Sequence, residues 1–137
     1  MGYSTPKQFH KVAGKTVIEH TVDVFDNDRH IDEVAIVVHP SYVDEMENIV
    51  TRNNWKKVKK ILRGGDERYM SSLSAIMAYG DLKEECNLIF HDAVRPLVNS
   101  RIIKDVVDAL KNYEAVDVVV PATDTIVQVD EEGRCIA

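Results

Sequence analysis

The sequence is poor in cysteine and in long apolar runs, and both shortages exclude classes of protein. Cys86 and Cys135 are the only cysteines in 137 residues and lack CxxC spacing, which excludes a disulfide scaffold and a CxxC zinc site. No apolar run approaches the ~18 residues that a membrane-spanning helix needs, so we expect no integral membrane protein. Residues 1–9 carry no apolar segment of the signal-peptide type. We therefore expect a reducing, cytoplasmic setting.

Positive charge is also scarce. The chain has 17 Lys and Arg against 23 Asp and Glu, which gives a formal net charge of -6. A nucleic-acid-binding domain normally presents a basic surface, so we expect no nucleic-acid partner. The lysines at 56–60 beside Trp55 fit a solvated strand edge better than an RNA contact. Because 45% of the residues are hydrophobic, the chain can bury a core, and its length suits a single domain over 1–137.

The apolar pattern alternates between helical spacing and short β-branched runs. The resulting order, α-β-α-β-α-β-α-β, predicts an α/β fold with three layers, in which helices cover both faces of a mostly parallel sheet. Three positions are expected to bound helices: Ser41 with Asp44 resembles a capping box, Gly80 fits a C-cap, and Asn99 or Ser100 fits an N-cap. The predicted helices lie near 16–25, 43–50, 70–77 and 102–110, and the predicted strands at 33–38, 58–62, 87–90 and 116–120.

Both ends of the sequence look unlike the ends of a complete domain of this class. The first element is already a polar loop followed by a helix, whereas doubly wound domains usually open with a central strand. After Pro121 the residues at 126–129 alternate, and 131–134 reads as a hairpin turn. We expect an internal piece of a longer protein.

One polar cluster, at 63–72, follows the predicted strand 58–62. Gly64 and Gly65 would let backbone amides approach a ligand, and the helix that follows favours an anion at its N-terminus. Ser71 and Ser72 add hydroxyl groups. The simpler alternative is a glycine-containing turn with a serine cap.

A second cluster, at 91–96, follows the predicted strand 87–90. A carboxylate at a strand tip, Asp92, is well placed to hold a divalent cation together with substrate phosphates. Arg95 could bind a phosphate or carboxylate. Alternatively, Asp92 caps a turn and pairs with Arg95, and His91 fits a packed histidine better than a ligand.

Two further candidates are weaker. Thr123, Asp124 and Thr125 follow the predicted strand 116–120 but also fit an ordinary Asx or Ser/Thr turn. Lys7 precedes the first helix, where lysines are usually just solvated. The position of the three polar clusters, each after a predicted strand, strengthens the prediction of a binding site. In open α/β sheets, residues at the carboxyl ends of strands meet in one crevice.

Together these motifs resemble the cytidylyltransferases that act on sugar-alcohol phosphates such as 2-C-methyl-D-erythritol 4-phosphate or ribitol 5-phosphate. The similarity covers nearly all of the chain, in family order. It implies a Rossmann-like nucleotide-diphospho-sugar transferase fold and a homodimer in which a β-arm, beginning near residue 123, completes the partner's active site. The matching motifs are Pro6–Phe9, Gly14–Thr21, Gly64–Arg68 with Ser71, His91–Pro96 and Thr123–Thr125.

The resemblance also implies a reaction and roles for individual residues. A polyol phosphate oxygen would attack the α-phosphorus of CTP and release pyrophosphate. Lys7 would be catalytic, and Asp92 would carry Mg²⁺. Arg95 and Thr125 would hold the second substrate. The nucleotide would be bound by Gly64, Gly65, Asp66, Arg68 and Ser71.

The chain departs from the family pattern in what it lacks. The glycine-rich phosphate loop would lie just before Met1, and a second acidic metal ligand and a C-terminal lysine are absent. We therefore expect these 137 residues alone to be inactive. An alternative is a non-catalytic nucleotide-binding or dimerisation module, which would bind CTP without turnover. Residues 37–42, the Ser71-Ser72 pair and Ala93-Val94 lean toward ribitol 5-phosphate as substrate.

Overall fold

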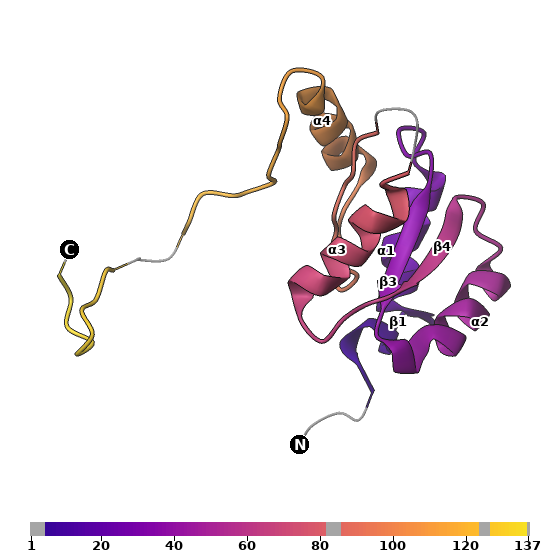
Figure 1. The fold of residues 1–137 in the computed structure, drawn as a ribbon, viewed down its shortest axis with the longest axis horizontal. Helices are drawn as coiled ribbons and strands as arrows, with labels where there is room; N and C mark the ends of the chain where they lie inside the picture. The colour runs from indigo at the N-terminus through magenta and orange to yellow at the C-terminus, as the bar shows by residue number, and fades with distance from the viewer. Residues whose placement is uncertain (1–4, 82–85, 124–126, 137) are drawn as a thin grey trace.

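The computed structural model describes residues 5–81, 86–123 and 127–136 as an α/β structure (Figure 1). Over these ranges no helix is both long and apolar enough to cross a bilayer. The helices are η1 (Lys7–Phe9), α1 (Val17–Asn27), η2 (Pro40–Tyr42), α2 (Val43–Asn53), α3 (Arg68–Tyr79) and α4 (Ser100–Leu110); the strands are β1 (Lys11–Val12), β2 (Lys15–Thr16), β3 (Val34–Val38) and β4 (Val58–Arg63).

The central sheet is formed by β3 and β4, which run parallel and are connected through α2. Val34 pairs with Val58, but Ala35 pairs with Lys60, so the ladder shifts by one residue at its start. The predicted parallel pairing of these two runs is confirmed. A short antiparallel hairpin, β1–β2, precedes α1.

The helices and the sheet form three layers, because side chains along β3 point alternately to its two faces and helices cover both. Ile36 and Val38 are buried on one face, in a cluster with α1 and α2. The other face is covered by α3, which contacts both strands. The layers can be followed in Figure 1 and confirm the predicted α/β class. The buried cluster comprises Phe9, Ile18, Val22, Ile36, Val38, Met46, Ile49 and Trp55.

A buried capping box fixes the start of α1. The Thr16 hydroxyl accepts from the Glu19 amide, and the Glu19 carboxylate accepts from the Thr16 amide at 2.7 Å. Glu19 also accepts from Asn53 at 2.8 Å and pairs with Arg52 at 2.9 Å. Burial alone would raise the pKa of the Glu19 carboxyl, but these hydrogen bonds outweigh it and lower the pKa from 4.5 to about 2.

The stability of the fold should depend on the charge of Glu19. A carboxyl whose pKa is lower in the folded state stabilises at neutral pH, and that contribution is lost as pH falls from about 4.5 to about 2. We expect Glu19→Gln to cost about 2 kcal/mol at pH 7 and to flatten the pH dependence in this window. Urea unfolding at pH 7 and pH 3 measures both effects. Equal losses of stability at the two pH values would contradict this role.

The prediction of two of the four strands is wrong. Residues 87–90 and 116–120 join no sheet within the described residues. A strand exists only where a neighbour satisfies its backbone N–H and C=O groups, and neither segment has one there. Their side chains are exposed accordingly: Phe90 is 56% and Val120 is 84% exposed.

Of the three predicted helix boundaries, one is wrong and two are confirmed. Ser41 does not cap α2, because Pro40 opens a 3-10 turn and Tyr42 becomes the N-cap residue without a side-chain hydrogen bond. Gly80 is the C-cap residue of α3, as predicted. Asn99 caps α4, since its side-chain oxygen accepts from the Ile102 amide at 3.1 Å.

The predicted C-terminal hairpin turn is confirmed. Val129 and Cys135 form an antiparallel bridge, and the Ile136 amide donates to the Gln128 carbonyl at 2.9 Å. Gly133, at φ +80°, takes the left-handed conformation that closes the turn. Beyond α4 the chain runs away from the helices and strands (Figure 1).

Candidate functional site

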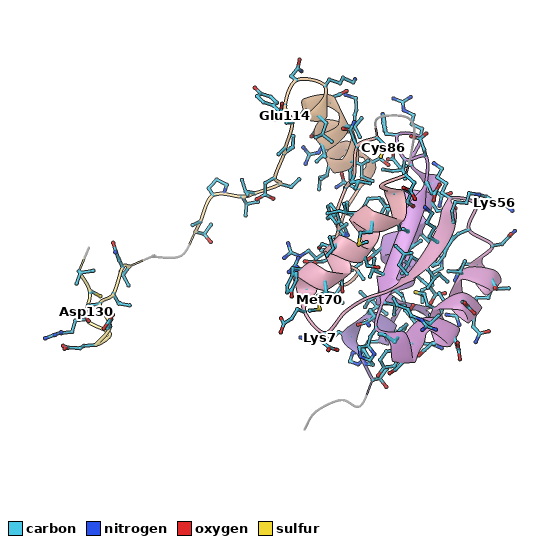
Figure 2. All side chains as sticks on the ribbon, in the orientation of Figure 1. Lys7, Lys56, Met70, Cys86, Glu114 and Asp130 are labelled. Carbon is cyan, nitrogen blue, oxygen red and sulfur yellow. The ribbon has the colours of Figure 1, made fainter. Side chains whose placement is uncertain are left out.

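Segments distant in sequence meet where β3 and β4 end. The Gly64 amide, just after β4, donates to the carbonyl of Val38 at the end of β3, at 2.8 Å. The ring of Phe9 packs against Tyr42, just after β3, with 5.3 Å between centroids. Phe9 thereby holds η1, which carries the exposed Lys7, near the same end of the sheet (Figure 2).

The glycine loop packs closely against the first turn of α3. A Cβ on Gly65 would lie 2.4 Å from the Cβ of Met70, and one on Gly64 would lie 2.7 Å from the Ser71 hydroxyl oxygen. Glycine is therefore required at position 65, where the loop approaches its own helix, whereas the Ser71 hydroxyl beside Gly64 can rotate away. Asp66 is exposed in this loop, and Arg68 is the first residue of α3.

Asp92 joins this loop to the predicted metal-site motif. One carboxylate oxygen pairs with an Arg68 guanidinium nitrogen at 2.8 Å, and the other pairs with Arg95 Nε at 3.0 Å. The Asp92 side chain is 31% exposed, whereas Arg68 and Arg95 are 84% and 74% exposed. The structure thus brings together residues 24 positions apart, and the predicted Asp92–Arg95 pairing is observed alongside the Arg68 contact.

The loop that carries Asp92 is anchored on α1. The Thr21 hydroxyl donates to the carbonyl of Ala93 at 2.8 Å, and Ala93 packs against the buried core. The His91 ring meets Phe25 edge-on at 5.1 Å, and its partial burial lowers the pKa of the imidazole. His91 thus packs on Phe25, in line with the predicted packed histidine, but the residue as a whole is exposed.

Removing the anchor should loosen this loop. Thr21→Val keeps the side-chain shape but leaves the Ala93 carbonyl without its donor, so we expect a loss of about 1 kcal/mol in unfolding free energy. Chemical denaturation measures it. Thr51→Val, on the exposed face of α2, serves as the control and should change stability little. Equal effects of the two substitutions would contradict the anchoring role.

The structure brings some of the predicted site residues together and leaves others apart or undescribed. Arg68, Asp92 and Arg95 are in direct contact, and the glycine loop with Ser71 adjoins them. Within the described residues Lys7 makes no ion pair with Asp92. Thr125 lies outside the described residues. The catalytic and binding roles themselves remain predictions.

Sequence reasoning missed Thr21, which anchors the Asp92 loop, and Glu19, which fixes the start of the helix that carries Thr21. Thr21 occupies the apolar stripe of α1, and a hydroxyl at such a position needs a partner, which is the signal that could have found it. Glu19 is likewise buried, at 4% exposure. Its role could be read from the Thr16-x-x-Glu19 capping pattern.

The donor set at Asp92 fits one kind of metal site. Across the described part of the chain, no group of three or more His, Cys, Asp or Glu side chains could hold a metal ion. A single half-buried carboxylate does not build an all-protein site. It does suit Mg²⁺, which is commonly held by one or two carboxylates together with substrate phosphates and water.

A separate concavity of about 440 Å³ lies between the end of α1 and the start of α4. None of the predicted site residues lines it. The lining residues are Asn27, Asp28, Arg29, His30, Ser100, Arg101 and Lys104.

Known proteins resemble this chain over almost its whole length. It is 47% identical over 134 residues to the bifunctional ribulose 5-phosphate reductase/CDP-ribitol pyrophosphorylase Bcs1 of Haemophilus influenzae, covering 98% of this chain and 28% of that protein. It is 40% identical over 136 residues to the 2-C-methyl-D-erythritol 4-phosphate cytidylyltransferase of Thermobifida fusca, covering 98% of this chain and 55% of the relative. The chain thus spans about half or less of these curated relatives.

A solved structure and a family model agree with these relatives. The crystal structure of 4-diphosphocytidyl-2C-methyl-D-erythritol synthase from Anaerococcus prevotii superposes with a TM-score of 0.76 at 23% identity, covering 92% of this chain and 54% of that one. This likeness confirms the predicted Rossmann-like nucleotidyltransferase fold. The family model IspD, 2-C-methyl-D-erythritol 4-phosphate cytidylyltransferase, matches residues 1–137. The chain therefore belongs to this cytidylyltransferase family.

Proposed function

We propose that the chain is the CTP-binding part of an enzyme that transfers CMP to a sugar-alcohol phosphate and releases pyrophosphate. Family membership supports the cytidylyltransferase activity. The observation that carries the site is the 2.8 Å ion pair between Arg68 and Asp92. It puts the proposed nucleotide-binding and cation-binding motifs on one surface.

Transfer of a nucleotidyl group needs in-line positioning and neutralisation of phosphate charge more than covalent help from the protein. The phosphate oxygen of the polyol phosphate forms a bond to the α-phosphorus of CTP. The bond from that phosphorus to the bridging oxygen breaks, and its electron pair leaves with pyrophosphate. Lys7, an exposed point charge on η1, would stabilise the charge that develops on the α-phosphate.

The remaining roles follow the geometry around Asp92. Asp92 would hold Mg²⁺, which when bound neutralises part of the triphosphate charge. Gly64, Gly65, Asp66, Arg68 and Ser71 would surround the cytidine. Arg95 and Thr125 would bind the phosphate or hydroxyl groups of the second substrate.

Ribitol 5-phosphate is the substrate we favour. The motif differences at residues 37–42, 71–72 and 93–94 lean that way. The relative named as a CDP-ribitol pyrophosphorylase is 47% identical, against 40% for the 2-C-methyl-D-erythritol 4-phosphate cytidylyltransferase from Thermobifida fusca.

We further propose a cytoplasmic homodimer. The hairpin at 127–136 stands apart from the body (Figure 1), and Val127 and Val129 are about half exposed. Such a hairpin could add its backbone groups to a partner subunit. The two cysteines described by the structure are free and exposed, as suits a reducing compartment.

The experiment is an assay of pyrophosphate release by the full-length protein. It is supplied with CTP, Mg²⁺ and either ribitol 5-phosphate or 2-C-methyl-D-erythritol 4-phosphate. We expect turnover that requires all three components, faster with ribitol 5-phosphate. CTP binding without turnover on either polyol phosphate would overturn the proposal in favour of a non-catalytic module.

A further inference from the structure

Both oxygens of the Asp92 carboxylate are already engaged by positive groups. Arg68 reaches one at 2.8 Å from the start of α3, and Arg95 reaches the other at 3.0 Å from within the same loop. The three groups carry a net charge of +1. We call this arrangement of Arg68, Asp92 and Arg95 the arginine clamp.

The contacts within the clamp oppose two binding events, that of a cation and that of a triphosphate. A divalent cation on Asp92 would lie beside two guanidinium groups, and repulsion between like charges opposes it. Each guanidinium contacts Asp92 through a single nitrogen, so a triphosphate can bind the remaining N–H donors. The phosphate charge then competes with the carboxylate for the same cation and weakens its contact with Asp92. The exchange needs no movement of the core, because both arginine side chains are mostly exposed.

We propose that the clamp makes cation and nucleotide binding mutually dependent. Without nucleotide, Arg68 and Arg95 act as internal counter-ions that keep a divalent cation off Asp92. A bound triphosphate withdraws them, and the carboxylate becomes available. By reciprocity, occupation of Asp92 by the cation releases the arginines toward the phosphates. This inference rests on the proposed function, because it assigns the same site to CTP and its cation.

The first test measures Mn²⁺ binding to the full-length protein without nucleotide, by the electron paramagnetic resonance signal of free Mn²⁺. We expect Arg68→Gln and Arg95→Gln each to tighten Mn²⁺ binding about threefold, and the double variant about tenfold. Arg63→Gln is the matched control. It removes a positive charge beside Gly64, from a side chain that makes no ion pair with Asp92 in the described structure.

A second test measures the effect of the clamp on nucleotide binding. In EDTA, Asp92→Asn should tighten metal-free CTP binding about threefold or more, because both guanidinium groups lose their internal partner. Glu67→Gln, which removes a carboxylate next to Arg68 that makes no ion pair with any residue the structure describes, should have less than half of this effect. Isothermal titration calorimetry with CTP gives both values.

The outcomes separate this inference from the proposed function. Arginine variants that bind Mn²⁺ no tighter than Arg63→Gln, or an absence of Mn²⁺ binding in every variant, would overturn the clamp even if the enzyme turns over CTP. Tighter Mn²⁺ binding that Asp92→Asn abolishes would support the clamp. If the protein then lacks cytidylyltransferase activity, only the proposed function fails.

Discussion

Replacement of Asp92 by asparagine should lower the kcat for CMP transfer at least about a hundredfold. Asparagine preserves the shape of the side chain but removes the negative charge, so it neither holds Mg²⁺ well nor pairs with Arg68 and Arg95. Without this charge neutralisation, the negative charge that develops on the phosphates in the transition state is less well stabilised, and kcat falls. Pyrophosphate release by the full-length protein, at saturating CTP and Mg²⁺, measures the loss.

The matched control is Asp105→Asn. Asp105 lies on α4, is 60% exposed and pairs with Arg101 at 3.5 Å, so its substitution removes an equal charge outside the candidate site. We expect its kcat to stay within about twofold of wild type. A kcat for Asp92→Asn within threefold of this control would show that the carboxylate is not part of the machinery.

Truncation of Met46 to alanine should cost about 3 kcal/mol of unfolding free energy. Met46 is fully buried, at 0% exposure, in the layer where α1 and α2 cover β3. Its removal costs the transfer free energy of the lost atoms and adds a cavity that the neighbours Ile36 and Ile49 fill only in part. Equilibrium urea unfolding followed by circular dichroism gives the value.

Met77→Ala provides the comparison for this core substitution. Met77 is 70% exposed on α3, so the same chemical change should alter stability by less than about 0.5 kcal/mol. Similar losses at both positions would mean that the packing of α2 on the sheet does not dominate stability.

The helices and the parallel pair were accessible from sequence because their signals are local. Ile18 and Val22, one helical turn apart, mark the buried stripe of α1. The β-branched run at 34–38 marks a strand covered on both faces. The Asn99-Ser100 pair marks the start of α4, because both side chains favour backbone donors at a helix N-terminus, and the structure shows Asn99 as the cap.

The features that could not be predicted from the sequence are those that depend on contacts between residues far apart in the chain. The run at 116–120 has strand composition, but no neighbour among the described residues pairs with it. Of the three polar clusters expected to meet, the described structure brings together those at 63–72 and 91–96, through a contact of Asp92 that the sequence did not predict. Whether Asp92 pairs with Arg95 alone or also with Arg68 depends on where α3 begins, which the sequence does not specify to the residue.

The most direct test of the account is a structure of the full-length protein with CTP and Mg²⁺. We predict the triphosphate between the glycine loop and Asp92, with Lys7 at the α-phosphate and the Arg68–Asp92 contact broken. CTP bound in the concavity between α1 and α4, with Asp92 still held by both arginines, would contradict it.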